Sequence, residues 1–243
     1  MRRQSGVWER DESCKAPPYR MAGAGGRGGS RSRSHSRGGR PKPEPSTRRA
    51  GRRDDSLVPQ QLELRLPDPC LVVLVGPAGA GKTTFAARHF APDEVLSSDA
   101  YRALLAGDPT DQRATAPAFA ALHRALRHRL SRGLLTVVDA TSAGPHDRRP
   151  LLAAAAAAGV VAVAIVLDLP EETVLARNRS RGELAVPEAA VRRHLARVAA
   201  SLREPGLAAE GFATVMVVRE PAAVDALRVV RVVSAGGGAP AAG

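Results

Sequence analysis

Aromatic residues are scarce in this chain: Phe, Trp and Tyr together make up 3% of its 243 residues. Nucleic-acid-binding sheets that stack bases on exposed rings need several aromatic side chains, so this shortage argues against that class. A hydrophobic content of 44% still suffices for a sizeable core. That core must consist of Val, Leu, Ile and Ala, which is typical of buried parallel strands covered by Ala-rich helices.

Cysteines and long apolar segments are also few. Cys14 and Cys70 are the only cysteines in the sequence, which excludes a disulfide framework, so we expect a reducing, cytoplasmic setting. The apolar stretch Leu151–Leu167 has 17 residues, short of the roughly 20 that a membrane-spanning helix needs. We interpret it as an Ala-rich helix, a cap at Gly159 and a buried strand, and we expect neither a signal peptide nor contact with a membrane.

The positive charge is concentrated near the N-terminus. Of the formal net charge of +12, residues 1–55 carry +9, with 15 Lys+Arg against 6 Asp+Glu, and residues 56–243 carry +3. Residues 1–60 are rich in Gly, Ser, Arg and Pro, so we expect a disordered basic arm. Its arginines could bind nucleic-acid phosphates, or the arm could be a dispensable extension. We expect residues 234–243 to be a flexible tail.

Between residues 62 and 233, short apolar runs alternate with helical stretches. This alternation predicts one α/β domain with a parallel sheet and helices on both faces. Expected strands are residues 70–75, 94–96, 134–138, 160–167, 212–218 and 228–233. Expected helices are residues 82–89, 99–105, 116–132, 147–158, 171–180 and 187–204.

The segment 76–83, GPAGAGKT, fits the phosphate-loop pattern G-x-x-x-x-G-K-[ST], with a predicted strand before it and a helix after it. Its glycines let backbone N–H groups point at phosphate oxygens, and the helix start adds positive charge. Lys82 is the only lysine of the predicted domain, and it stands where a flexible ammonium neutralises the β- and γ-phosphates during catalysis. We expect the ATP site to contain Gly76, Pro77, Ala78, Gly79, Ala80, Gly81, Lys82, Thr83 and Thr84.

Two acidic residues lie where strands are expected to end. Asp99, at a helix start, could act as general base toward an acceptor hydroxyl, and Arg102 on the same face could hold an anionic group of that acceptor. Asp139 could hold Mg²⁺ together with Thr83, directly or through water. Both acids also have a structural interpretation, since Asp favours helix starts and caps turns.

The segment 175–182, LARNRSRG, carries Arg177 and Arg181 at a helix end. Their spacing of four predicts that both lie on one helix face. Arginines that close over the γ-phosphate stabilise the charge of phosphoryl transfer, and Gly182 could hinge such a lid. Alternatively, they complement the dipole at the helix C-terminus.

Together these motifs resemble the kinase domain of bacterial polynucleotide 5′-hydroxyl kinases, a branch of the P-loop kinases. The matching phrases within residues 71–218 are GPAGAGKTTFAARHF, EVLSSDAYR, DQRAT, LTVVDAT, VAIVLDLPEE, LARNRSRG and EGF. The resemblance implies a P-loop kinase-type fold with an arginine lid, ATP and Mg²⁺ as cofactors, and a nucleic acid 5′ end as acceptor.

By the same resemblance, Lys82 and Thr83 bind ATP and Mg²⁺, and Asp99 is the general base. Arg102 then contacts the phosphate next to the 5′-hydroxyl, and Arg177 and Arg181 belong to the lid. The sequence departs from the family at Ser142, where the family phrase DATN has Asn, and we detect no fused phosphatase or ligase domain.

Three functions stay open at this point. The first is phosphorylation of the 5′-hydroxyl of RNA or DNA. The second is phosphorylation of a small hydroxylated metabolite, sugar, antibiotic or nucleoside on the same scaffold. The third is a non-catalytic, ATP-binding regulatory module whose basic arm recognises a partner.

Overall fold

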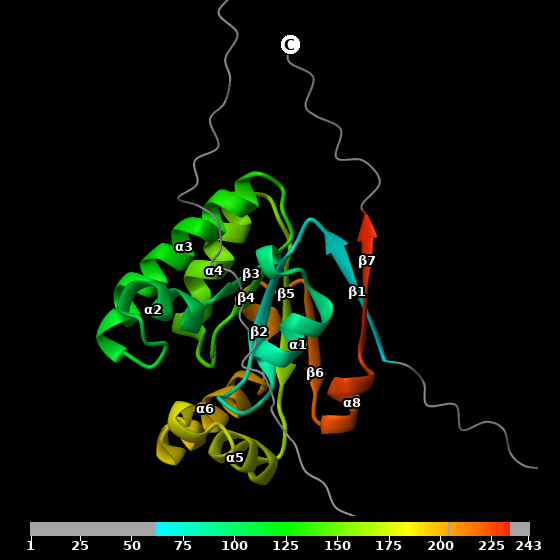
Figure 1. Ribbon diagram of the computed structural model, residues 1–243. Helices are drawn as coiled ribbons and strands as arrows, with labels where there is room; N and C mark the ends of the chain where they lie inside the picture. The colour runs from blue at the N-terminus through cyan, green and yellow to red at the C-terminus, as the bar shows by residue number, and fades with distance from the viewer. Residues whose placement is uncertain (1–61, 204, 234–243) are drawn as a thin grey trace, which may run out of the picture. The chain divides into compact units, whose positions relative to one another are not determined.

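The structure is a computed structural model that describes residues 62–203 and 205–233 (Figure 1). The basic arm expected at 1–60 and the tail expected at 234–243 lie outside these described residues. The same holds for Cys14.

Five parallel strands form the main sheet, in the order β3-β4-β2-β5-β6. They are β2 (Leu71–Val75), β3 (Val95–Ser97), β4 (Thr136–Asp139), β5 (Ala162–Leu167) and β6 (Thr214–Val218). Every residue of β2 and β5 is buried, because helices cover both faces of the sheet and an unbroken apolar run fits that environment. The expected α/β fold, with a parallel sheet between helices, is therefore confirmed.

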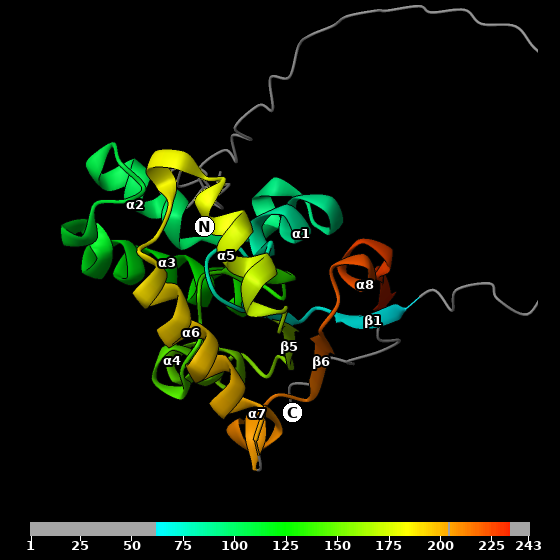
Figure 2. The same cartoon turned by 90° about the horizontal axis from the view of Figure 1, so that it is seen from below.

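Helices pack on both faces of this sheet (Figure 1 and Figure 2). They are α1 (Lys82–His89), α2 (Ser98–Ala106), α3 (Thr115–Ser131), α4 (Pro145–Ala157), α5 (Glu171–Arg179), α6 (Glu188–Ser201), α7 (Gly206–Glu210) and α8 (Pro221–Ala226). One core cluster contains Phe85 of α1 and Val224 of α8, and the other contains Leu122 of α3 and Leu151 of α4. Successive residues of β2 alternate between the two clusters, as the period of a strand requires.

The uncharged stretch from residue 151 onward folds as expected. Helix α4 ends at Ala157, Gly159 takes a positive φ of 65°, and β5 begins at Ala162. Across the two described ranges, no helix combines the length and the apolar character that a transmembrane span requires.

A second sheet of two parallel strands pairs β1 (Glu63–Asp68) with β7 (Arg228–Val233). The strand expected at 228–233 is therefore present, but it pairs with β1 and not with the main sheet. Strand β1 was not predicted, although Leu64 and Leu66 alternate with charged residues there and are buried in the cluster that contains α1.

The order of the strands fixes where a ligand can bind. After β2 the chain crosses to β3 and β4 on one side, and it then passes to β5 and β6 on the other. Ligands of open parallel sheets bind beyond the carboxyl ends of the strands at such a reversal. The phosphate loop follows β2 directly, so the fold puts the predicted nucleotide site at this position.

Candidate active site

The phosphate loop is packed tightly against helix α5. Gly79 and Gly81 have φ values of 86° and 95°, which side chains other than glycine rarely adopt. A Cβ added at Gly79 would lie 2.4 Å from the carbonyl oxygen of Val174 and 3.0 Å from the backbone nitrogen of Asn178. Only a residue without a side chain fits, so the loop and α5 are in direct backbone contact.

Lys82 folds back over the loop. Its Nζ donates to the carbonyl oxygens of Gly76 at 2.8 Å and Pro77 at 2.9 Å, and the side chain is buried. Burial lowers the pKa of Lys82, whereas the charges of Asp139 and Asp99 act in the opposite direction. The ammonium therefore lies at the loop, within electrostatic range of both predicted acids.

Thr83 and Asp139 lie side by side. The Thr83 hydroxyl donates to Oδ2 of Asp139 at 2.7 Å, and Asp139 is the last residue of β4 and only 4% exposed. Burial raises the pKa of the Asp139 carboxyl, and Lys82 and the hydrogen bond from Thr83 partly oppose this. A hydroxyl and a carboxylate oxygen at this spacing fit the oxygen ligands that Mg²⁺ prefers.

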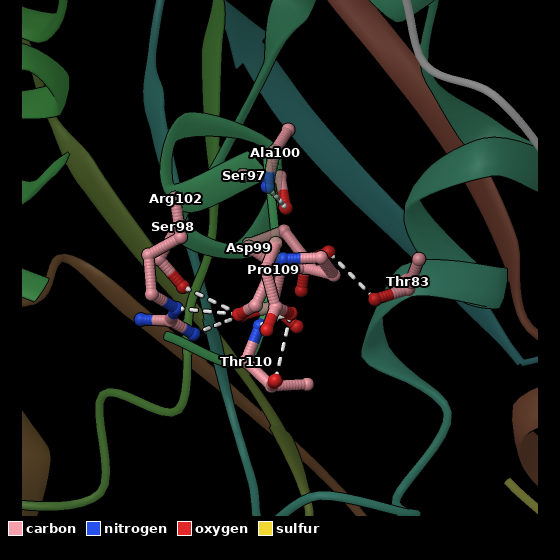
Figure 3. Close-up of polar contacts among 10 residues, drawn as sticks. Thr83, Ser97, Ser98, Asp99, Ala100, Arg102, Pro109 and Thr110 are labelled. Carbon is pink, nitrogen blue, oxygen red and sulfur yellow. Dashed lines mark hydrogen bonds and ion pairs between the residues drawn. The ribbon is translucent and has the colours of Figure 1, made fainter. Parts of the chain in front are cut away.

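Asp99 and Arg102 form an ion pair on the first turns of α2 (Figure 3). The cap of this helix is Ser97, whose Oγ accepts from the Ala100 N–H at 3.4 Å, so Asp99 is not the capping residue. Its side chain is half exposed, while that of Arg102 is 14% exposed and also donates from Nε to the Pro109 carbonyl at 2.8 Å. The carboxylate is thus accessible and the guanidinium is fixed in place.

The sheet register brings Asp99 to the same edge as Asp139. Ser97 of β3 pairs with Asp139 of β4, and Asp99 follows two residues later. The charge of Asp99 also raises the pKa of Asp139 and that of Lys82, although burial is the largest influence on each. The structure therefore brings together the predicted general base, the predicted metal ligand and the phosphate-loop lysine.

The two predicted lid arginines occupy different elements. Arg177 is exposed in the last turn of α5, and its Nη1 lies 3.6 Å from the position of a Cβ at Gly81. Helix α5 ends at Arg179, so the expectation that Arg177 and Arg181 share one helix face is wrong. Arg181 is exposed at the start of a 3-10 turn (Gly182–Leu184). Its positive charge acts to lower the pKa of Lys82 and that of Asp139.

The remaining loop residues have simpler environments. Ala80 donates its N–H to the Pro77 carbonyl at 3.2 Å, and Ala78 is partly buried against the core. Thr84 is exposed on the first turn of α1. These contacts shape the loop, and Thr84 is accessible from solvent.

Two buried polar residues near the site were not predicted from the sequence. Asn178 of α5 is 1% exposed and bridges to Val186, donating to its carbonyl at 2.7 Å and accepting from its N–H at 3.1 Å. This closes the arginine-bearing segment 179–185 into a loop. Arg148 of α4 is fully buried beside the end of β4. Neither has a local sequence signal, because their partners lie 6 to 62 residues away.

A family model described as "AAA domain" matches residues 71–205, which covers the phosphate loop, both predicted acids and both predicted lid arginines. A search of curated proteins finds no match to the sequence.

Several solved structures are similar in fold. A gluconokinase from Sinorhizobium meliloti is 19% identical over 66% of this chain and 90% of its own, with a TM-score of 0.42. Kti12 from Chaetomium thermophilum, in complex with ADP-AlF3, is 17% identical over 64% and 93%, with a TM-score of 0.48. A chain of the Pnkp1/Rnl/Hen1 RNA repair complex is 22% identical over 56% and 45%, also at 0.48. At these identities and scores, none of them assigns a substrate.

Proposed function

The chain belongs to the AAA domain family, and from this premise we propose that it is an ATP-dependent phosphotransferase acting on a hydroxyl group. The acceptor that we propose is the 5′-hydroxyl of a polynucleotide. The observation that carries the proposal is the half-exposed carboxylate of Asp99, which lies within electrostatic range of the phosphate-loop lysine Lys82 and of Asp139.

In the proposed reaction Asp99 accepts the proton of the acceptor hydroxyl. The hydroxyl oxygen bonds to the γ-phosphorus of ATP, the bond to the β,γ-bridging oxygen breaks, and ADP leaves. Lys82 exchanges its contacts with the Gly76 and Pro77 carbonyls for contacts with phosphate oxygens. Arg177 and Arg181 stabilise the charge that develops on the transferred group.

The metal part of the proposal involves Thr83 and Asp139. Bound Mg²⁺ would supply charge neutralisation at the β- and γ-phosphates. The Thr83 hydroxyl and the Asp139 carboxylate would hold it, because they already lie 2.7 Å apart. Asp139 would hold the metal directly or through a bound water.

Two arguments support a polynucleotide acceptor. The motifs resemble polynucleotide 5′-hydroxyl kinases, and Arg102 stands one helical turn from Asp99 with a planar fork suited to a phosphate. A nucleotide at a 5′ end carries its first phosphate on the 3′ side of the same sugar. The guanidinium of Arg102, beside the general base Asp99, would therefore hold that phosphate while the 5′-hydroxyl faces Asp99.

One observation favours a second candidate, a kinase of a small hydroxylated molecule. Arg102 is already engaged by Asp99 and by the Pro109 carbonyl, and its side chain is 14% exposed. In this alternative Arg102 orients the Asp99 carboxylate and does not bind substrate. The acceptor then needs no phosphate.

Transfer of labelled phosphate from ATP tests the proposal. Full-length protein is assayed with RNA and DNA oligonucleotides bearing a 5′-hydroxyl, with the same oligonucleotides bearing a 5′-phosphate, and with a panel of sugars, nucleosides and antibiotics. We expect label only on the 5′-hydroxyl oligonucleotides. Label found only on members of the panel would mean that the acceptor is a small molecule and not a polynucleotide. Nucleotide binding without transfer to any acceptor would mean that the protein is a regulatory module and not a kinase.

A further inference from the structure

Every nitrogen of the buried Arg148 guanidinium donates at least one hydrogen bond. The side chain is fully buried on α4 and forms a two-pronged pair with Glu210, from Nε at 2.8 Å and from Nη2 at 2.5 Å. Nη2 also donates to Ser201 Oγ at 2.9 Å, and Nη1 donates to the Ser142 carbonyl at 2.7 Å. A buried guanidinium is tolerated only when it is paired in this way. Because losing a partner would leave this buried charge unpaired, the geometry of these contacts should be closely fixed.

These contacts hold the loop that joins β4 to α4. Ser142 is buried with a φ of 44°, in the left-handed region that a serine rarely adopts. Its carbonyl is held by Arg148, and the next carbonyl, that of Ala143, accepts from Ser201 Oγ at 3.2 Å. An unfavourable backbone conformation persists only when its surroundings impose it. Arg148 and Ser201 supply that restraint.

The same loop begins at the proposed metal ligand. Asp139 immediately precedes it and accepts from Thr83, and the Thr141 carbonyl accepts from the Gly76 N–H at 3.2 Å. The loop is therefore bonded to the phosphate loop at its start and to Arg148 at its far end. Ser142, whose carbonyl Arg148 holds, is three residues from Asp139 along this loop.

We propose that Arg148, oriented by Glu210, is a positioning residue for the metal-binding end of β4: it fixes the 140–143 loop so that Asp139 faces Thr83 in the geometry that binds Mg²⁺ with nucleotide. This inference rests on the metal part of the proposed function. Outer partners that orient metal ligands typically change metal affinity by about 10–100-fold when they are removed.

Glu210→Gln is the first test variant. It keeps the size of the side chain but weakens the pairing that orients the guanidinium, which then releases the Ser142 carbonyl. Arg148→Lys is the second, since it keeps the charge but cannot reach Glu210, Ser142 and Ser201 together. The matched control is Glu94→Gln, which weakens another two-pronged pair, with Arg231 at 2.7 Å for both bonds.

The readout does not depend on catalysis. Binding of Mn²⁺ to the full-length protein in the presence of ADP is followed by electron paramagnetic resonance, and ADP affinity is measured with and without Mg²⁺. We expect Glu210→Gln and Arg148→Lys to weaken Mn²⁺ binding roughly tenfold. ADP affinity without metal should stay within about twofold, because the phosphate loop keeps its own glycine geometry.

Three outcomes decide the proposal. Wild-type Mn²⁺ affinity in a folded Glu210→Gln protein with a lowered melting temperature would overturn it, because Arg148 would then be structural only. Equal weakening by Glu94→Gln would also overturn it. If the test variants weaken Mn²⁺ binding while the wild type phosphorylates no acceptor, the positioning role stands and the proposed transfer reaction fails.

Discussion

Thr83 and Asp139 are 56 residues apart in the chain and are joined by a 2.7 Å hydrogen bond from hydroxyl to carboxylate. The bond links the first turn of α1 to the last residue of β4. It leaves a carboxylate at 4% exposure close to the ammonium of Lys82. The arrangement favours a bound cation, and without one the buried charge opposes folding.

Asp139→Asn should therefore have opposite effects on the metal-free protein and on metal binding: it removes a buried charge, and it also removes a predicted Mg²⁺ ligand. Burial raises the pKa of Asp139 above its value in the unfolded chain. An acid with a raised folded pKa contributes stability below its unfolded pKa, and this contribution is lost as pH rises through the folded pKa. The melting temperature of Asp139→Asn relative to wild type should thus increase from acid to neutral pH.

Thermal melts of both metal-free proteins across that range give this difference directly. In parallel, Asp139→Asn should lose the stabilisation that Mg²⁺ with ADP gives the wild type. A melting difference that shrinks toward neutral pH would contradict the assigned direction of the pKa shift.

Asp99→Ala should abolish transfer while nucleotide still binds. Removing a general base typically lowers the rate by about 10²–10⁴-fold. Asp99 contacts Arg102 and the Ser98 hydroxyl and makes no direct bond to the phosphate loop among the described contacts, so ADP affinity should stay within about twofold. Single-turnover phosphate transfer and ADP titration measure the two effects separately. A variant that keeps the wild-type transfer rate would remove Asp99 from the chemistry.

Arg102 distinguishes the two candidate acceptors through its kinetic signature. If it binds a substrate phosphate, Arg102→Lys should raise KM for oligonucleotides with little change for a nucleoside that lacks the phosphate. If it only orients Asp99, kcat should fall equally for both. Steady-state kinetics with a matched nucleoside and dinucleotide decide between them.

The sequence allowed the phosphate loop, its strand and helix, and the approach of Asp139 to Thr83 to be predicted, because parallel strands bring their carboxyl ends to one edge. Local patterns could not predict the pairing of β1 with β7, which joins Glu63 to Arg228. Nor could they predict Arg148 with Glu210, since an arginine in an Ala-rich helix gives no indication of a partner 62 residues away. Long-range pairings of this kind depend on the finished packing.

Gly79→Ala tests the contact between the phosphate loop and α5. Its Cβ would lie 2.4 Å from the Val174 carbonyl, so α5 must shift. A positive φ at a residue with a side chain costs about 1–2 kcal/mol, and overpacking adds about 1–3 kcal/mol. Together these costs should lower the free energy of unfolding by about 2–5 kcal/mol. Gly107→Ala is the control: its φ is 73°, and no described atom lies within 4 Å of the added Cβ, so only the first cost applies. Denaturant unfolding of both variants should separate them, and equal losses would contradict the backbone contact.

Arg177→Ala should slow transfer without changing stability. Arg177 is exposed, and its Nη1 lies against Gly81 of the phosphate loop, where the proposed reaction has it contact the γ-phosphate. An arginine that stabilises the transition state of phosphoryl transfer contributes about 10³–10⁵ in rate.

The control is Arg179→Ala, two residues along the same helix, because Arg179 is also exposed but pairs with Glu188 of α6 at 2.8 Å. That exposed pair contributes little to stability, so Arg179→Ala should keep its transfer rate within about twofold, and both variants should melt close to wild type. Equal rate losses in Arg177→Ala and Arg179→Ala would contradict a special role for the position of Arg177 against the loop. The general positive charge of α5 would then be what acts on the nucleotide.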